Sequence, residues 1–479
     1  MSDQAIPRGF GGAPQDEYRR TKRLYWEPSY VPKEAIYPPA NYEGIYFKDW
    51  DRWDDPFHMS FRQYVEIQAK KDNGFHPARE AFDRYGGADR MDRRWLEGMK
   101  VVYPILFHGE YGALRSHARV SRYAPAPALR AAAFYQSIDE LRHSQNHVYQ
   151  MRMLNKHTDG FNNWAEWKRH HFLLQPAKML FEDIVASENV FESVMGLNIL
   201  VELAYTNLVF VGVPSVGVLN GDLAGASEFL TTQSDETRHM AIGQSTLRTL
   251  LEGDDRNLPK IQYWLDKWFW LLHRIIGCPL GMIPDYFARR KALPMRQMFQ
   301  RYIVDNYVAG MLEDLGKYGL CAPRFLDDAV REMDDASHSL FRTLFQYKHM
   351  LFNKMFVPTD TDMEFFGEHY PHWEERHGTF WDEVRAGDPK DLPSLPMLCQ
   401  VCQLPCIFPV PESPTIRCAE WGGEVRWFCS DGCQWIFDHE PERYSKAVGL
   451  DRILTGKDVA EIRAHMRLSG KLGGVLEEC

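Results

Sequence analysis

Long stretches of the chain place apolar residues three and four positions apart, the spacing that puts them on one face of a helix. This pattern predicts helices over Phe61–Lys71, Arg93–Ser121, Leu129–Leu154, Asn163–Ser187, Phe191–Val211 and Leu223–Leu251, and further helix from Ile261 to Phe356. Breakers separate them at Ala124-Pro125-Ala126-Pro127 and at Pro214–Asp222. A mainly helical domain over residues 61–357 follows, with Trp264, Trp268 and Trp270 in its core.

The flanking segments differ from this domain in composition. Residues 1–60 are rich in Tyr, Trp and Pro and predict an extended N-terminal arm laid over an apolar surface. Residues 358–390 are aromatic and charged, and we expect a connection there. Residues 391–450 contain six of the nine cysteines and predict a small module, and residues 451–479 form a polar tail.

One motif occurs twice within the predicted helices. Asp139-Glu140-x-Arg142-His143 and Asp235-Glu236-x-Arg238-His239 share the frame Asp-Glu-x-Arg-His. Glu and His three residues apart project from one face of a helix, one turn apart. A single Glu-x-x-His pair arises often by chance, but two copies in the same frame indicate a shared function.

Each copy follows a lone glutamate on an apolar segment. Glu110 lies 15 residues before Pro125 and Glu140 lies 13 after Pro127, whereas Glu202 lies 12 before Pro214 and Glu236 lies 14 after Asp222. If both segments fold back as antiparallel helical hairpins, the arms are nearly equal in length and the glutamates return to one level. Four Glu and two His at one level form the ligand set of carboxylate-bridged di-iron bundles, which predicts a ferritin-like fold.

The chemistry of two iron ions requires such a set. Four carboxylates balance the four positive charges of two Fe(II) ions inside an apolar bundle, where an unbalanced charge would be costly. Two imidazoles supply one nitrogen to each iron and leave positions open for O2. The alternative is a polar, salt-bridged bundle interior. Glu202 argues against it, because it lies within the apolar stretch Leu197–Tyr205 and needs a strong partner.

Composition and charge narrow the class of protein further. The 479 residues are 44% hydrophobic and 25% charged, as in an ordinary globular protein, and the net charge of −10 disfavours nucleic-acid binding. Met1–Gln15 lacks a basic segment followed by an apolar core, so we expect no secretion signal and a cytoplasmic location. The apolar run Ile199–Leu219 contains Glu202, Asn207 and Pro214, and we interpret it as a buried helix and not a membrane span.

The cysteines predict a second metal site. Cys399-x2-Cys402 is followed after 26 residues by Cys429-x3-Cys433, a spacing typical of structural zinc held by four thiolates. Free cysteines and a mononuclear iron site are the alternatives. Cys406 and Cys418 fall outside this set.

These motifs resemble a known family over nearly the whole chain. The chain is similar to the hydroxylase α subunit of soluble bacterial multicomponent monooxygenases, the di-iron enzymes that act on phenol, toluene, alkenes and methane. The resemblance lies in the two Asp-Glu-x-Arg-His motifs, in Gly109-Glu110-Tyr111, in Glu202-x3-Thr206-Asn207 and in the cysteine segments. The cysteine segments look closest to phenol hydroxylases, and Gly-Glu-Tyr looks closer to toluene monooxygenases.

The resemblance implies a role for each matched residue. Glu110, Glu140 and His143 match the ligands of one iron, and Glu202, Glu236 and His239 match those of the other. Asp139 and Asp235, with Arg142 and Arg238, match residues that orient the histidines; surface charge is the alternative. Thr206 matches a threonine beside the O2 site, although a mid-helix threonine can also bond back to its own helix. The other matched positions are Asn207 and Gln233 near the cluster, and Leu106, Ala113, Phe181 and Phe210 in the substrate pocket, which could equally be core. His147 follows His143 by one turn, and we interpret it as structural.

The resemblance also implies an activity and partners. A catalytic subunit of this kind takes NADH-derived electrons from a separate reductase with FAD and an iron–sulfur cluster, and hydroxylates a small aromatic compound with O2. It implies β and γ hydroxylase subunits, in a dimer of αβγ units, and a small effector protein. The alternatives are oxidation of alkenes or alkanes by the same family, a ferritin-like iron-handling protein, and a fatty-acyl desaturase or ribonucleotide reductase small subunit.

Overall fold

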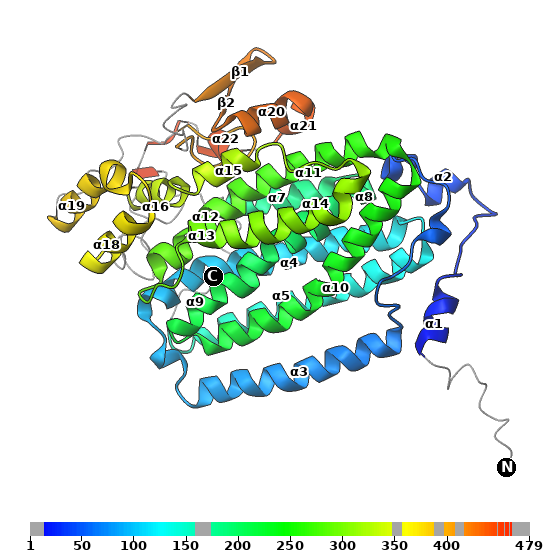
Figure 1. Cartoon of the computed structure of the whole chain (residues 1–479), viewed down its shortest axis with the longest axis horizontal. Helices are drawn as coiled ribbons and strands as arrows, with labels where there is room; N and C mark the ends of the chain where they lie inside the picture. Colours follow the sequence, from blue (N-terminus) through cyan, green and yellow to red (C-terminus); the bar gives the residue numbers. More distant parts are fainter. Residues whose placement is uncertain are drawn as a thin grey trace.

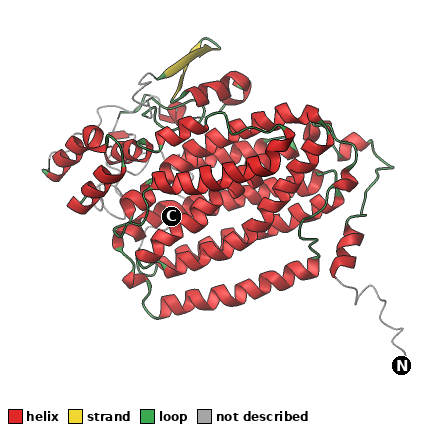
Figure 2. Cartoon of the chain, in the orientation of Figure 1, coloured by secondary structure: helices red, strands yellow, loops and turns green. Residues whose placement is uncertain are grey.

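The computed structural model describes residues 14–158, 174–346, 357–387, 397–407, 416–447, 449–454, 456–458 and 460–461. Helices dominate these residues, and the only sheet among them is one two-stranded hairpin (Figure 2). The first residues of the predicted arm, residues 163–173 of one predicted helix and most of the predicted polar tail lie outside the described part of the chain.

Four long helical segments form the central bundle (Figure 1). The first two, α4 and α5, pack along their length as an antiparallel hairpin, and α10 packs against η5, the centre of a composite helix. The bounds are α4 Arg93–Tyr123, α5 Pro127–Leu154, α8 Val190–Val194, η5 Met195–Thr206, η6 Leu208–Gly212, α9 Val213–Leu219 and α10 Leu223–Gly253. The two helical hairpins predicted from the sequence are therefore present.

Local sequence signals define where these helices begin. Pro127 occupies the first turn of α5, where its missing N–H is not needed. The Asp92 side chain accepts hydrogen bonds from the first turn of α4, and Asp222 accepts one from Gly225 N at 2.8 Å at the start of α10. Asp222 also accepts a hydrogen bond from Trp95 Nε1 at 3.0 Å, so this cap joins α10 to α4.

The composite helix from Val190 to Leu219 differs from the prediction in two ways. Its centre, η5 and η6, has π-helical hydrogen bonding, which the apolar pattern does not reveal. It also continues through Pro214, which was expected to break it: η6 ends at Gly212 and α9 begins at Val213, one residue before the proline. The chain turns instead at Asn220–Asp222, where Gly221 has φ +88° and packs against Arg90 O.

This helix is long and apolar enough to cross a membrane, but 72% of its apolar window is buried inside the structure. It is a buried helix of the bundle, as expected from Glu202, Asn207 and Pro214 within its apolar run.

A second layer covers the bundle. Helix α7 packs on α4, while α11 and η10 pack on η5. Trp264, Trp268 and Trp270 of α11 are buried in the core, as predicted. The bounds are α7 Leu174–Ala186, η7 Asp255–Asn257, α11 Leu258–Leu272, η8 His273–Gly277, α12 Cys278–Leu280, η9 Ile283–Phe287, α13 Met295–Phe299, η10 Gln300–Val308, α14 Ala309–Leu315, η11 Gly316–Tyr318, α15 Leu326–Glu332 and α16 Ala336–Gln346.

Helix α3 lies along the opposite side of the bundle (Figure 1). It spans Phe61–Arg84, followed by η4 at Ala88–Arg90, and is longer than the predicted Phe61–Lys71. A capping box between Ser60 and Gln63 begins it.

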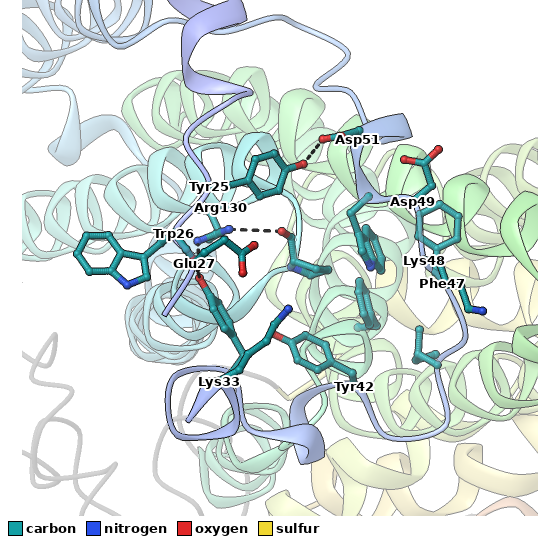
Figure 3. Close-up of a pocket in the computed structure, with 15 residues that line it drawn as sticks. Tyr25, Trp26, Glu27, Lys33, Tyr42, Phe47, Lys48, Asp49, Asp51 and Arg130 are labelled. Carbon is teal, nitrogen blue, oxygen red and sulfur yellow. Dashed lines mark hydrogen bonds between the residues drawn. The ribbon is translucent and has the colours of Figure 1, made fainter. Parts of the chain in front are cut away.

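In its described residues, 14–60, the N-terminal arm contains short helical segments, and it meets the end of α4 where Tyr42 donates a hydrogen bond to Tyr123 O. These segments are α1 Pro14–Thr21, α2 Lys33–Ile36, η2 Pro39–Tyr42 and η3 Trp50–Arg52. The arm and the bundle enclose an open pocket of about 450 Å³ (Figure 3). Its walls are the aromatic residues Tyr25, Trp26 and Tyr42, and Arg130 points into it from α5.

The C-terminal segments complete the fold. Residues 360–385, expected as a connection, form α18 Asp360–His369, η12 Glu374–Gly378 and α19 Thr379–Arg385, with Phe366, Trp373 and Trp381 buried. The cysteine module contains the antiparallel strands β1 Arg417–Trp421 and β2 Glu424–Phe428, then α20 Asp431–His439, α21 Pro441–Ser445 and α22 Leu450–Leu454. Gly422 and Gly423 form the hairpin turn with φ +62° and +79°. The module lies on the side of the bundle opposite α3 (Figure 1).

Candidate metal centre

Six side chains converge at one level in the middle of the bundle, all of them buried. Their ligand atoms form two overlapping groups, and within each group all atoms lie within 4.8 Å of one another. Glu140 and Glu236 belong to both groups, and each group has one histidine of its own. The first group is Glu110, Glu140, His143 and Glu236, and the second is Glu140, Glu202, Glu236 and His239. The two groups would hold two cations, and Glu140 and Glu236 are available to both groups.

The histidines present the same ring nitrogen to this centre. His143 Nδ1 lies 3.2 Å from Glu140 Oε2 and 3.4 Å from Glu236 Oε1. His239 Nδ1 lies 3.1 Å from Glu236 Oε2 and 3.4 Å from Glu140 Oε1. Because Nδ1 faces the carboxylates, Nε2 of each ring faces away and is available to a second partner.

The buried carboxylates of the cluster need compensation for their negative charge. Burial, and then the neighbouring Glu140 and Glu202, raise the pKa of Glu236 well above its ordinary value. Burial raises the pKa of Glu140 to about 8, against the opposing contact with His143. Among the described residues, no lysine or arginine forms an ion pair with any of the four glutamates. Buried carboxylates at this density need bound metal or protons, and with two imidazoles they fit a di-metal centre.

The aspartates of the two motifs bond to the histidines in a crossed arrangement. Asp235 Oδ2 lies 3.1 Å from His143 Nε2, and Asp139 Oδ2 lies 3.1 Å from His239 Nε2. Arg142 donates to Asp235 at 2.9 Å, and Arg238 donates to Asp139. Each motif therefore holds the histidine of the other motif, which ties α5 to α10 at the metal level.

Helix α3 supplies a clamp that the sequence did not indicate. Gln68 Nε2 donates to both Asp139 Oδ1 and Asp235 Oδ1 at 2.7 Å. Tyr64 donates to Asp139 at 2.9 Å, and Lys71 forms an ion pair with Asp235. In the sequence, the spacing of residues 64, 68 and 71 places them on one helical face. That spacing does not reveal that they bond to Asp139 and Asp235.

Two amides on the other side of the centre were also missed. Gln136 Nε2 donates to Glu140 Oε1 at 3.1 Å and to Glu202 Oε1 at 2.6 Å. Asn198 Nδ2 donates to Glu202 Oε2 at 3.1 Å and to Gln136 Oε1 at 2.9 Å. Each amide lies four residues before a glutamate of the centre, and this spacing could have identified both.

His147 also contacts the centre. Its Nε2 lies 3.5 Å from Glu110 Oε1 and its Nδ1 lies 2.7 Å from Glu228 Oε1, so it joins a ligand candidate to another buried carboxylate. It belongs to neither metal group.

A small cavity of about 70 Å³ adjoins the four glutamates of the centre. The four predicted pocket residues, Leu106, Ala113, Phe181 and Phe210, all line it, together with Thr206. Gly109 allows Phe181 to approach closely, since a Cβ at this glycine would lie 2.8 Å from Phe181 Cζ. Apart from the carboxylates, Thr206 and Tyr205, the lining residues are apolar.

The three predicted polar residues of the site lie in two places. Thr206 lines the cavity, and its hydroxyl donates to Val201 O at 3.1 Å, five residues back in the π-helical segment. Asn207 and Gln233 are half-buried and do not line the cavity. Gln233 Nε2 donates to Asn207 Oδ1 at 2.9 Å, which links the composite helix to α10.

The four predicted zinc ligands also converge. Cys399, Cys402, Cys429 and Cys433 are buried, with their sulfur atoms within 4.8 Å of one another. Cys429 Sγ lies 3.6 Å from both Cys402 Sγ and Cys433 Sγ. Thiolates at Zn–S distances of about 2.3 Å lie roughly 3.8 Å apart around a tetrahedral ion, so this group fits zinc.

A helical bundle with four buried glutamates, two histidines and an apolar cavity beside them defines the class of carboxylate-bridged di-metal proteins. Comparison with known proteins places the chain within that class. Residues 26–254 match the family model described as methane/phenol/alkene hydroxylase.

Individual relatives match over most of the chain. The oxygenase component of phenol 2-monooxygenase from Pseudomonas sp. (strain CF600) is 33% identical, over 90% of this chain and 85% of its own length. The α subunit of the oxygenase component of the alkene monooxygenase system from Xanthobacter autotrophicus is 28% identical, over 92% and 90%. The crystal structure of xenon-pressurised phenol hydroxylase from Pseudomonas sp. OX1 superposes with a TM-score of 0.87 at 31% identity, covering 95% of both chains.

The chain therefore belongs to the methane, phenol and alkene hydroxylase family, as its large hydroxylase subunit. The family has a di-iron centre, and the carboxylates and histidines of this chain fit such a centre.

The raised pKa values predict how pH affects the chain when iron is removed. Contact with Glu228 and then Glu110 raises the pKa of His147 to about 9, although burial alone would lower it. His147 and Glu140 thus keep their protons in the folded state over a pH range in which the unfolded chain has lost them. The free energy of unfolding therefore falls as the pH rises over that range, because the folded state binds more protons than the unfolded state.

We expect the melting temperature of the iron-free protein to fall by about 5 °C from pH 6.5 to 9, the change that a loss of roughly 2 kcal/mol produces in a large domain. Calorimetry at several pH values measures it. The iron-loaded protein is the control and should show a weaker dependence, because metal replaces the protons. An iron-free melting temperature that rises over this range would contradict the description of the centre.

Proposed function

We propose that this chain is the catalytic subunit of a multicomponent monooxygenase that hydroxylates a small aromatic compound. The observation that carries the proposal is the contact between the six-residue metal centre and an apolar cavity. Two bound iron ions would supply the activation of O2. One oxygen atom then enters the substrate and the other leaves as water, with NADH as the source of the two electrons needed.

The residues would divide this work. Glu110, Glu140, His143, Glu202, Glu236 and His239 would hold the irons, and Asp139 and Asp235 would orient the histidines, each neutralised by an arginine. Thr206 would pass a proton beside the cavity, and Asn207 and Gln233 would stabilise the helix that carries it. Leu106, Ala113, Phe181 and Phe210 would exclude water and position the substrate.

The chain would work with partner proteins in the cytoplasm. We infer a reductase with FAD and an iron–sulfur cluster, a small effector protein, and β and γ subunits in a dimer of αβγ units. Two observations support this inference: the family match, and the fact that relatives are oxygenase components of larger systems.

The cavity volume favours a second candidate substrate. A benzene-sized guest occupies cavities of about 150 Å³, roughly twice the volume found here. An aromatic ring therefore requires the walls to move, and the close contact of Phe181 with Gly109 is part of one wall. A small alkene would need less movement.

Product analysis tests the function. The purified hydroxylase is combined with reductase, effector protein and NADH under 18O2, and supplied separately with phenol, toluene, benzene and propene. Mass spectrometry should find one 18O atom in an aromatic product. If propene alone gives a labelled product, an 18O epoxide, the substrate is an alkene and not an aromatic compound. If the protein stores iron and forms no oxygenated product, the proposed function is wrong.

The first variant prediction concerns a shared ligand. Glu236→Ala removes a carboxylate that lies in both metal groups, so iron content should fall from two ions per chain to one or none, and turnover should be lost. Iron analysis and the turnover assay measure both effects. Glu252→Ala, a change in an exposed glutamate on the same helix, is the control and should keep iron and activity. Full iron content in the Glu236 variant would refute its role as a ligand.

The second variant prediction concerns the Thr206 hydroxyl. Thr206→Ala should separate NADH consumption from product formation and release peroxide, whereas Thr206→Ser should keep most coupling because it keeps the hydroxyl. The measurement is the ratio of product to NADH consumed. Thr249→Ala removes a hydroxyl that bonds back to Ser245 O at 2.8 Å, away from the cavity, and is the control. If Thr206→Ala and the wild type form the same amount of product per NADH, the Thr206 hydroxyl has no role in proton transfer.

We also propose that the four cysteines hold one structural zinc ion. Four thiolates fill a tetrahedral shell and leave no position for substrate, so the ion would stabilise the module. Cys429→Ser should lower zinc content and destabilise residues 397–454 but leave two irons in place. Cys418→Ser, an exposed cysteine of the same module, should change neither metal. Retention of zinc in the Cys429 variant, or redox-active iron at this site, would contradict the proposal.

A further inference from the structure

One face of the α11–η8 helix run is covered by the cysteine module. Tyr263, Lys267, Trp270 and Arg274 follow one another at helical spacing and form this face. Tyr263 donates to Glu440 Oε1 at 2.6 Å, and Lys267 donates to the same oxygen at 2.9 Å. Lys267 is buried and also forms an ion pair with Glu192 at 3.0 Å, so this contact is part of the protein interior.

The contact is tightest beside the thiols. Trp270 is 1% exposed, and its Nε1 donates to Ser430 Oγ at 3.2 Å. Ser430 in turn accepts a hydrogen bond from Cys433 N at 3.2 Å. A Cβ at Gly432 would lie 2.4 Å from the Trp270 ring, so the indole rests on the loop that carries Cys429 and Cys433.

Charge links the same helix run to the cysteines. Arg274 is fully buried and bonds to Glu332. Burial lowers the pKa of Arg274, but the charges of Glu332 and then Cys429 raise it further than burial lowers it. A zinc ion with four thiolates carries a net charge of −2, and a cation at this position would favour it, although Glu332 already takes up much of the charge of Arg274.

The other face of this helix run forms a wall of the substrate cavity. Leu272, at the end of α11, and Ile276, in η8, both line the cavity. A shift of the helix run at Trp270 would therefore move two cavity side chains.

The module also contacts the helix behind a second wall. Tyr444 donates to Asp183 Oδ2 at 2.9 Å, and Arg443 bonds to the same carboxylate. Asp183 lies on α7 two residues after Phe181, which lines the cavity and closes it against Gly109. None of the six metal-centre residues lies on α7, α11 or η8.

We propose that the zinc-loaded module positions two walls of the substrate cavity, one through Trp270 and one through Tyr444, and so sets which substrates fit. Trp270, Gly432 and Tyr444 are positioning residues that act through Leu272, Ile276 and Phe181. The module thus governs substrate choice, while the four bundle helices govern the metal centre. The part that concerns substrates rests on the proposed function.

Hydrogen exchange measured by mass spectrometry tests the mechanical link without any assay of activity. The complete hydroxylase is compared before and after zinc removal by a chelator, with iron content checked in both samples. Backbone amides of residues 174–186 and 270–280 should exchange at least about tenfold faster after zinc removal, whereas those of α5 should not change. Faster exchange confined to residues 397–454 would overturn the proposal.

Substrate competition tests the effect on the cavity. Gly432→Ala and Tyr444→Phe should each change the ratio of kcat/KM for toluene and benzene by about tenfold, the discrimination that one methyl group allows in an apolar pocket. Iron content should stay unchanged. Tyr370→Phe is the matched control, because it removes a buried tyrosine–aspartate hydrogen bond, to Asp285, in a different part of the structure.

The possible failures are distinguishable. An unchanged ratio in Tyr444→Phe and Gly432→Ala, or an equal change in Tyr370→Phe, would overturn the role in substrate choice. If the wild-type hydroxylase oxidises neither compound, the proposed function fails, and the exchange experiment still decides whether the module positions the walls.

Discussion

Four carboxylates held within a few ångströms of one another inside an apolar bundle are the constraint on which the rest of this structure depends. Each would cost several kcal/mol to bury as an unpaired charge, and mutual repulsion increases that cost. Burial accordingly raises the pKa of Glu140 and Glu236. Two divalent cations would remove the penalty, and metal binding would then be coupled to the stability of the folded bundle. A centre of this kind can exist only where four helices bring the carboxylates to one level.

The surrounding polar groups hold this arrangement in place. The crossed pairs His143–Asp235 and His239–Asp139 join α5 to α10, and Gln68 of α3 bridges both aspartates. On the other side, Gln136 and Asn198 hold Glu202 within η5. The π-helical hydrogen bonding of η5 sets the angular positions of Glu202 and Thr206, and π-helical segments occur often at functional sites. Ligand orientation therefore depends on helices that carry no ligand, such as α3.

The bundle helices build the metal centre and much of the cavity wall, and second-layer helices complete that wall. Bundle helices hold the metal ligands, whereas Phe181, Leu272 and Ile276 come from second-layer helices that the cysteine module contacts from outside.

The sequence by itself determined the main helices, the duplicated motifs and the four-cysteine set. The four cavity residues followed from the family resemblance. Local spacing carries this information: Glu and His three residues apart must share a helical face, and arms of nearly equal length must return to one level. Only the tertiary structure showed that each aspartate bonds to the histidine of the other motif and that Gln68 bridges both aspartates. It also showed that the helix continues through Pro214, that residues 360–385 are helical, and where the cysteine module packs. The physical reason is distance along the chain. Gln68 and Asp235 are separated by 167 residues and Trp270 and Ser430 by 160, and no local pattern records which distant side chains will meet.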